Sequence, residues 1–370
     1  MVLDHCEISK NNEFVITASG EGPPQVWDLK SGDLHSVQMD GSDLSTVSAH
    51  LACRDQILVG HVIDEKSSKE EENGVYVLQL WHFKTGKKIK ILEDIKSSAS
   101  CFGDQDKNDL ILARRHTKGD SILVWDLIGN ENKDEIFYNA DNSDPLITFL
   151  RLSNNERFLL AGFDNGENQD CSYLIFDFHS DNVSKCMKGI AVDAEVDATE
   201  LINDIEAITG TRKGHLFIWN IQTCEVIRQF QRSTIIKDGG LPAHDDLINS
   251  VNLSKDGKYI ISCGRDKTIK VWKTEGGKLL HSLEGHISEV TSGVISVESE
   301  LIISSSLDGT IRVWRLLDGN QMCCFSSNIA ILHIKLTHDE KAIIGLGLRD
   351  GNYKMVMLQL MRHKIKSCKI

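Results

Sequence analysis

The feature that most constrains this chain is a short pattern that occurs twice. The stretch SCGRDKTIKVW covers residues 262–272, and SSSLDGTIRVW covers residues 304–314. Both read Ser-x-x-x-Asp-x-Thr-Ile-[Lys/Arg]-Val-Trp, and the second begins 42 residues after the first. Self-similarity at a fixed period of this length is typical of repeat architectures. The chain is therefore expected to consist of consecutive copies of one supersecondary unit.

The tryptophan that ends each pattern marks a position that recurs along all 370 residues. Equivalent positions are separated by 54, 44, 51, 43, 53, 42 and 44 residues, and they use all six tryptophans of the chain. The eight anchors, one for each unit, are Trp27, Trp81, Trp125, Phe176, Trp219, Trp272, Trp314 and Leu358. We therefore predict a single domain over residues 1–370. Residues 363–370 (HKIKSCKI) are expected to form a final strand.

The sixth unit shows four short strand-like runs most clearly. Residues 248–254, 259–264, 268–273 and 278–283 are apolar or alternating, and short turn sequences separate them. Alternation with turn signals every 8–12 residues predicts antiparallel sheet. A four-stranded sheet of ~40 residues buries too little surface alone, so the units are expected to stack. A ring of such sheets leaves no long exposed edge.

These units resemble the WD repeats of β-propeller proteins over nearly the whole chain. The best copy begins with Gly285-His286 and ends with Trp314, and literal Trp-Asp pairs occur at 27–28 and 125–126. The resemblance implies an all-β propeller of eight four-stranded units, either eight-bladed or seven-bladed with one extra unit. The diverged repeats are also similar to the C-terminal repeat region of NACHT-and-WD-repeat proteins. Whether the chain is a piece of a larger polypeptide or a compact complete protein stays open.

A set of four polar residues recurs at spacings of 18, 4 and 6. The two copies are His244, Ser262, Asp266 and Trp272, and His286, Ser304, Asp308 and Trp314. In the resembled family such side chains form a hydrogen-bonded chain within one blade, because a buried carboxylate or indole N–H must be paired. The alternative interpretation is a catalytic triad, but a catalytic site is not usually duplicated at identical spacing. Lys213 and Glu21 replace the aspartate in the fifth and first units, which are expected to lack most of the network.

The residue before each turn aspartate is a candidate for partner binding. In the resembled fold this position points outward on the face where the turns between second and third strands gather. It is occupied by Arg212, Arg265, Leu307 and Arg349. Arginine anchors interfaces and binds carboxylates and phosphates in bidentate geometry. We therefore predict that a protein partner docks here through an acidic or phosphorylated segment.

Composition narrows the classes of function. The net charge of -13 disfavours a general nucleic-acid or anionic-membrane surface. No run approaches the ~18 apolar residues of a membrane span. The ten cysteines form no C-x-x-C motif, and no set of residues has metal-ligand spacing. Scattered free thiols fit a reducing compartment, so a cytoplasmic location is expected.

The sequence therefore favours a non-enzymatic protein–protein interaction scaffold, the sensor or regulatory propeller of a larger signalling protein. No catalytic residue, cofactor or metal is expected. An RNA-binding propeller is one alternative; it would need a basic face with exposed aromatic residues, and aromatic residues make up only 6% of the chain. A propeller enzyme that uses the central funnel is the other. The oligomeric state and the identity of the partner stay open.

Overall fold

The structure is a computed structural model, and its described residues form β-strands, turns and one short 3-10 helix. It describes residues 5–9, 11–18, 24–36, 45–52, 56–63, 75–85, 87–92, 100–102, 110–115, 121–126, 131–137, 146–153, 157–164, 172–177, 182–186, 194–232, 241–298, 300–349 and 352–359. The chain divides into two compact units. Unit 1 comprises residues 1–168 and 173–184, and unit 2 comprises residues 169–172 and 185–370.

The first four sheets contain four strands each, and consecutive strands pair within each sheet. The strands of these sheets are β1 His5–Ile8, β2 Phe14–Ala18, β3 Gln25–Asp28, β4 Leu34–Ser36; β5 Ser45–Ala52, β6 Gln56–Ile63, β7 Val75–His82, β8 Lys87–Leu92; β9 Ser100–Phe102, β10 Leu110–Arg115, β11 Ser121–Asp126, β12 Glu131–Phe137; β13 Leu146–Leu152, β14 Phe158–Asp164, β15 Ser172–Asp177 and β16 Asn182–Cys186.

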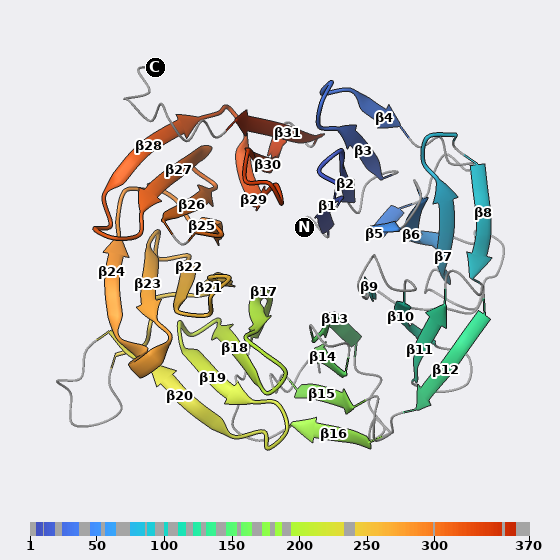
Figure 1. Cartoon of the computed structure of the whole chain (residues 1–370), viewed down its shortest axis with the longest axis horizontal. Coiled ribbons are helices and arrows are strands. Elements are labelled where there is room, and N and C mark those ends of the chain that lie inside the picture. The colour runs from blue at the N-terminus through green and yellow to red at the C-terminus, as the bar shows by residue number, and fades with distance from the viewer. Residues whose placement is uncertain are drawn as a thin grey trace, which may run out of the picture. The chain divides into compact units, whose positions relative to one another are not determined.

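The last four sheets belong to unit 2. Their strands are β17 Ala194–Leu201, β18 Glu206–Thr211, β19 Leu216–Asn220, β20 Val226–Phe230; β21 Ile248–Leu253, β22 Tyr259–Gly264, β23 Ile269–Lys273, β24 Leu279–Leu283; β25 Val290–Ile295, β26 Leu301–Ser306, β27 Thr310–Arg315, β28 Gln321–Ser326; β29 Ala330–Leu336, β30 Ala342–Arg349 and β31 Asn352–Gln359. The short 3-10 helix η2 (Glu275–Gly277) lies between β23 and β24. Figure 1 shows these sheets in chain order.

The all-β propeller fold class is confirmed by antiparallel sheets of the predicted size. Each of the eight anchors lies in the third strand of its sheet, from Trp27 in β3 to Leu358 in β31. In the sixth sheet the anchor Trp272 is fully buried and pairs with Ile260 on one side and Leu279 on the other. Trp314 pairs in the same way with Ile302 and Gln321. The tryptophan is thus the central packing residue of each well-matched sheet.

Within unit 2 the sheets pack face to face. The first strands β17, β21, β25 and β29 follow one another in contact, whereas the fourth strands β20, β24 and β28 lie on the outer side (Figure 1). Between the fifth and sixth sheets, Phe230 meets Trp272 edge to face with ring centroids 5.5 Å apart. Ile208, Ile218 and Ile248 complete this apolar layer. Stacking of this kind supplies the burial that a single sheet lacks.

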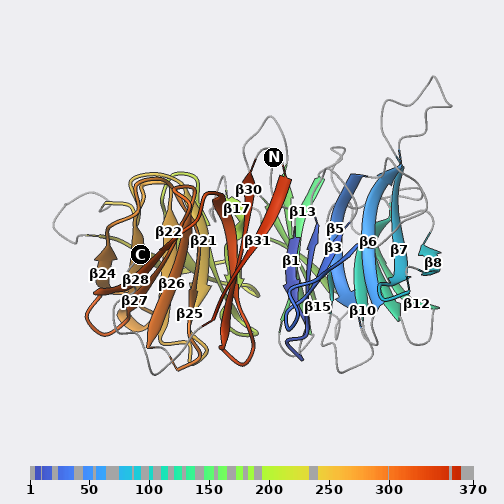
Figure 2. The ribbon, with the colours of Figure 1, turned by 90° about the horizontal axis from the view of Figure 1, so that it is seen from above.

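The turns of unit 2 gather at the two ends of its strands. Figure 2, which views the strands from the side, shows β21, β22, β25 and β26 side by side with nearly parallel axes. Because consecutive strands are antiparallel, turns between second and third strands lie at one end, and turns between first and second strands lie at the other. The end that carries the turns between second and third strands is the one on which the candidate site lies.

The eighth sheet differs from the others. It contains three strands among the described residues, in the order β29, β30, β31, whereas the other seven sheets contain four. The final strand expected at residues 363–370 lies outside the described residues. The prediction of eight four-stranded units is therefore met by seven sheets in the described part of the chain.

Two further properties of the described residues concern membrane spans and cysteines. None of their helices is long and apolar enough to span a membrane. Cys263 is a buried free thiol, and Cys323 and Cys324 are also free. Cys224, however, takes part in a disulfide, which the scattered cysteine spacing did not predict.

Candidate functional site

The first copy of the polar set joins three parts of the sixth sheet. His244 lies in the connection before β21, Ser262 in β22, Asp266 in the turn after β22, and Trp272 in β23. The His244 ring nitrogens lie 3.0 Å (Nδ1) from a carboxylate oxygen of Asp266 and 2.7 Å (Nε2) from the Ser262 hydroxyl. The Trp272 indole N–H donates to the same hydroxyl at 3.0 Å. The structure thus brings the four residues together in one chain.

The second copy repeats this geometry in the seventh sheet. His286 Nδ1 lies 3.0 Å from Asp308, and His286 Nε2 lies 2.9 Å from the Ser304 hydroxyl. The Trp314 indole donates to Ser304 at 2.9 Å. Each aspartate also accepts a backbone N–H from the residue that follows the histidine, Asp245 at 3.1 Å and Ile287 at 3.0 Å. The connection, the second strand and the third strand are therefore tied at one end.

The pattern of donors requires a neutral imidazole. If Nδ1–H donates to the carboxylate, Nε2 is free to accept from the serine hydroxyl, whose oxygen accepts the indole N–H. A proton on Nε2 would leave the serine hydroxyl with no acceptor in this chain. Burial, opposed by the carboxylate, lowers the pKa of His244 and of His286. The geometry and the direction of these shifts agree on neutral histidines.

The aspartates stay ionised at neutral pH. Burial works to raise the pKa of Asp308, but hydrogen bonds from Thr310, the backbone N–H of Ile287 and His286 outweigh it and hold the pKa at about 2. The same balance holds the pKa of Asp266 well below its usual range, with burial opposed by His244 and Thr268. A carboxylate that accepts several hydrogen bonds is favoured in its charged form.

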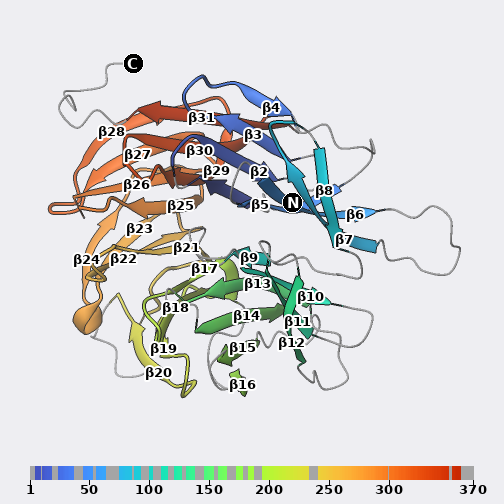
Figure 3. The ribbon, with the colours of Figure 1, turned by 45° about the vertical axis from the view of Figure 1, so that its right-hand side comes forward.

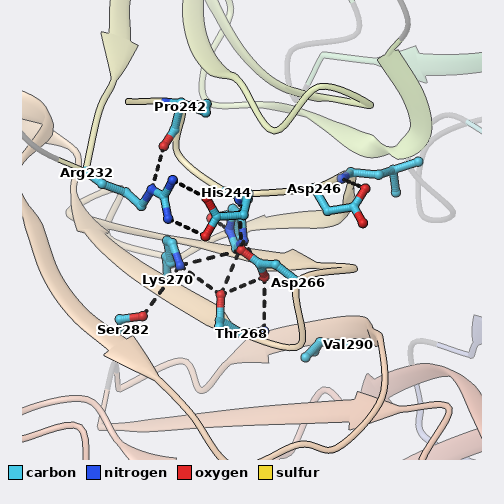
Figure 4. Close-up of polar contacts among 12 residues, drawn as sticks. Arg232, Pro242, His244, Asp246, Asp266, Thr268, Lys270, Ser282 and Val290 are labelled. Atoms are coloured by element: carbon cyan, nitrogen blue, oxygen red, sulfur yellow. Dashed lines mark hydrogen bonds and ion pairs between the residues drawn. The ribbon is translucent and has the colours of Figure 1, made fainter. Parts of the chain in front are cut away.

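A threonine extends each network, and a lysine extends the first. Thr268 donates to Asp266 at 2.7 Å, and Thr310 donates to Asp308 at 2.6 Å. Both threonines stand two residues after the aspartate in the repeated pattern, and the predicted network did not include them. Figure 4 shows Lys270 beside Thr268 and Asp266. The buried Lys270 ammonium donates to Thr268 at 2.8 Å and lies 3.7 Å from Asp266.

An arginine forms an ion pair beside the first network. Arg232 follows β20, and its guanidinium donates to both carboxylate oxygens of Asp245. It also donates to the Pro242 carbonyl (Figure 4). The hydrogen bonds from Arg232 lower the pKa of Asp245. The two ends of the connection between β20 and β21 are thereby joined in a bidentate pair, the strongest form of this interaction.

The serine hydroxyls are not placed for nucleophilic chemistry. Ser262 and Ser304 are each 0% exposed, and each hydroxyl is shared between the imidazole and the indole. A nucleophile must reach its substrate and hold an attack geometry. These two serines instead satisfy buried donors, which is a stabilising role.

The fifth sheet contains a shortened network that sequence reasoning missed. The Trp219 indole donates to Thr209 at 3.1 Å, and the Thr209 hydroxyl lies 3.3 Å from that of Thr199 across the strand pair. The hydroxyl stands ten residues before the tryptophan, the same spacing as in the two complete sets. That spacing was the available signal. In the second sheet, Gln79 accepts the Trp81 indole at 3.0 Å instead.

The outward positions before the turn aspartates gather at one end of unit 2. The exposed Arg265 and Leu307 begin the turns after β22 and β26, and their backbone N–H groups donate to Leu247 and Glu289 of the preceding connections. The exposed Arg212 lies in the turn after β18, whose Gly214 carbonyl accepts from His244 N–H. Arg349 ends β30, and its side chain lies outside the described residues.

Charges and apolar groups alternate on this surface. Arg265 Nε lies 3.1 Å from Glu289 and 3.9 Å from Asp246. Ile287 is 76% exposed and Leu307 is 37% exposed. We call the set Asp246, Arg265, Ile287, Glu289 and Leu307 the turn surface. Its arginine is paired with two acids, so charged and apolar groups both contribute to this surface.

Comparison with a protein family places the two polar sets inside recognised repeats. The family described as "WD domain, G-beta repeat" matches residues 236–273 and 277–315. A crystal structure of the computationally designed Ika8 protein superposes with a TM-score of 0.67 over 96% of each chain at 19% identity, which bears on the fold alone.

Curated relatives match parts of the chain. GID complex subunit 7 of Schizosaccharomyces pombe is 25% identical over 167 residues, which are 45% of this chain and 30% of that protein. Methylosome protein WDR77 of Xenopus laevis is 26% identical over 30% of this chain and 31% of its own length. DDB1- and CUL4-associated factor 13 of Dictyostelium discoideum is 31% identical over 20% of this chain and 14% of its own length. The chain thus spans less than a third of the length of these relatives.

Proposed function

Because this chain belongs to the WD-repeat family, we propose that it is a non-enzymatic scaffold for protein–protein contacts and the regulatory propeller of a larger signalling protein. The observation that carries the proposal is the turn surface, which combines exposed apolar side chains with an arginine. Interfaces are enriched in such combinations, with arginine and apolar anchors at the centre and charged residues at the rim.

Rigid sheets with variable turns suit a platform. The polar sets hold the turns after β22 and β26 in place by fixing their aspartates. Turn residues such as Ile287 and Leu307 are therefore presented on a fixed frame, which lowers the entropic cost of binding. Relatives named as parts of the GID complex and as a CUL4-associated factor agree with a role in assemblies.

The chemistry of the partner follows from the charges on the turn surface. Arg265 shares its Nε with Glu289 and Asp246, so an incoming carboxylate or phosphate must compete with both acids. A phosphorylated segment, with its higher charge, competes better than a single carboxylate. We propose a partner segment that places a phosphate or an acidic cluster on Arg265 and apolar side chains on Ile287 and Leu307.

Affinity capture from lysate with mass spectrometry tests this function. The baits are the intact chain and Arg265→Glu, which puts a third acid beside Glu289 and Asp246. Lys258→Glu is the matched control, because it makes the same charge change in the turn at the opposite end of β22. We expect specific proteins to be retained by the intact chain and Lys258→Glu and lost by Arg265→Glu.

Other results would contradict the proposal at different levels. Equal retention by all three baits would keep the scaffold and remove the turn surface as its site. Retention of nothing but RNA would replace the scaffold with the RNA-binding alternative. Circular dichroism and a thermal melt of each bait first establish that the variants are folded, so that a loss of retention reports on the surface.

A further inference from the structure

A β-bulge interrupts the first strand of the sixth, seventh and eighth sheets near its start. The extra residue is Asn249 in β21, Thr291 in β25 and Leu332 in β29. The extra residue of a bulge stands outside the regular ladder, and the bulge aims its side chain in a new direction. Each bulge can therefore direct a side chain toward a neighbouring sheet.

The bulges of the sixth and seventh sheets place a polar side chain on the next sheet. Figure 3 shows β21, β25 and β29 in succession, and each is in contact with the next. The Asn249 side-chain amide donates to the Val290 carbonyl at 2.9 Å, and the Thr291 hydroxyl donates to the Ile331 carbonyl at 2.8 Å. Both acceptors directly precede the extra residue of the next bulge. These hydrogen bonds thus join consecutive sheets from bulge to bulge.

The first of these hydrogen bonds holds backbone that adjoins the turn surface. That surface has two halves, one from the sixth sheet and one from the seventh: Asp246 and Arg265, and Ile287, Glu289 and Leu307. Val290 directly follows Glu289 in the second half. Asn249 stands two residues after Leu247, whose carbonyl accepts the Arg265 N–H at 2.8 Å. The bond from Asn249 to Val290 therefore ties the backbone of one half to the backbone of the other.

The ion pair between Arg265 and Glu289 is a second contact between the two halves. Its side chains are 55% and 32% exposed, and exposed ion pairs contribute little to stability because water and salt screen them. The hydrogen bond from Asn249 to Val290 is partly buried, where such a bond is stronger. Asn249 therefore holds the spacing of the two halves more firmly than the surface ion pair does.

We propose that Asn249 is a positioning residue for the partner site, which fixes the spacing between the two halves of the turn surface. Its effect on binding rests on the function proposed above for that surface. A partner segment that contacts Arg265, Ile287 and Leu307 spans both halves. A surface held at a fixed spacing binds such a segment at a lower entropic cost. Removal of the Asn249 donor should therefore weaken binding although no residue of the turn surface changes.

The seventh sheet supplies the variants for the test. Thr291 makes the equivalent bond from the equivalent bulge, so Asn249→Thr should keep a donor to the Val290 carbonyl. Asn249→Val has nearly the shape of Asn249→Thr but lacks the hydroxyl. Thr291→Val removes the bond between the seventh and eighth sheets, so it controls for a general loss of stability.

Hydrogen exchange of the full chain, followed by mass spectrometry, tests the positioning without a partner. We expect residues 286–292 to exchange about tenfold faster in Asn249→Val than in the intact chain, because one hydrogen bond is lost. In Asn249→Thr they should exchange at the rate of the intact chain. Equal exchange in Asn249→Val and the intact chain would overturn the proposal.

Affinity capture from lysate tests the effect on binding, at a temperature where circular dichroism shows every variant to be folded. Proteins retained by the intact chain should also be retained by Asn249→Thr and Thr291→Val, and lost by Asn249→Val. Equal retention by Asn249→Val would overturn the positioning role. If the intact chain retained no specific protein, the proposed function would be contradicted, and hydrogen exchange would still decide whether Asn249 fixes the surface.

Discussion

At the scale of residues, the aspartate of each polar set holds the largest number of partners. Asp308 accepts from His286, Thr310 and the backbone N–H of Ile287. Its side chain is 1% exposed, so water does not replace these bonds easily. The set therefore behaves as one cooperative group, in which removing a member leaves the others unpaired.

The first prediction concerns this aspartate. Asp308→Ala leaves the His286 N–H and the Ile287 N–H without their acceptor, and we expect a loss of about 1–3 kcal/mol in the free energy of unfolding. Urea unfolding followed by tryptophan fluorescence measures it. Asp318→Ala, in the exposed turn after β27, is the control and should change stability little. Unchanged unfolding in Asp308→Ala would remove the structural role.

The second prediction concerns pH. The folded pKa values of His244 and His286 are lowered, so below pH 6.5 the unfolded chain binds protons that the folded chain does not. Stability that is complete above about pH 6.5 is therefore lost as the pH falls toward 5. The Asp308 carboxylate, whose folded pKa is about 2, contributes stability that is fully present above about pH 4. This contribution is lost as the pH falls from about 4 through the folded pKa of about 2.

Urea unfolding at pH 7.5, 6.5 and 5.5 measures this dependence. The chain with both His244→Gln and His286→Gln is the comparison, because it lacks the two buried imidazoles. Its stability should be lower at pH 7.5 and should fall less steeply with acid. Parallel slopes for the two chains would mean that other histidines cause the pH dependence.

At the scale of elements, the sheets of unit 2 approach one another most closely where small residues allow it. A Cβ placed on Gly293 of β25 would lie 2.6 Å from Cys263 Sγ of β22 and 3.1 Å from Ile261. Cys263 is fully buried, and burial raises the pKa of its thiol, so it packs as an apolar group. The contact between the sixth and seventh sheets thus depends on a glycine facing a cysteine.

The third prediction uses this contact. Gly293→Ala overpacks the interface between the two sheets and should cost about 1–3 kcal/mol in the free energy of unfolding. Cys263→Ala makes room for the added methyl group. The double variant should therefore lose less free energy of unfolding than the two single variants lose together. A double-mutant cycle in urea measures the coupling. A coupling of zero would contradict the close packing of β22 on β25.

Much of the element pattern was predictable because it is local. Alternation, turn residues and the tryptophan spacing predict all eight third strands, including β31 without a tryptophan. The shortened network of Thr209 and Trp219 was missed because a threonine stands where the complete sets have a serine, and because Lys213 replaces the aspartate of this unit. The pairing of Arg265 with Glu289 was not predictable, since it joins residues of two sheets whose registers the sequence does not give.

At the scale of the whole molecule, the fourth prediction is that residues 1–370 form one propeller domain. Repeats that each contact only their neighbours unfold together when the contacts between neighbours are strong. We expect a single calorimetric transition with equal calorimetric and van't Hoff enthalpies. Two separate transitions would show that the sheets form two domains.

The central claim is that the repeated polar sets stabilise the sheets while the turn surface binds the partner. Ser304→Ala tests it most directly, because it removes the acceptor of the Trp314 N–H and the donor to His286 without touching the turn surface. The measurement is retention of captured proteins at a temperature where the variant is folded. We predict full retention and a lowered melting temperature. Loss of retention at an unchanged melting temperature would make the serine part of a functional site and contradict the account.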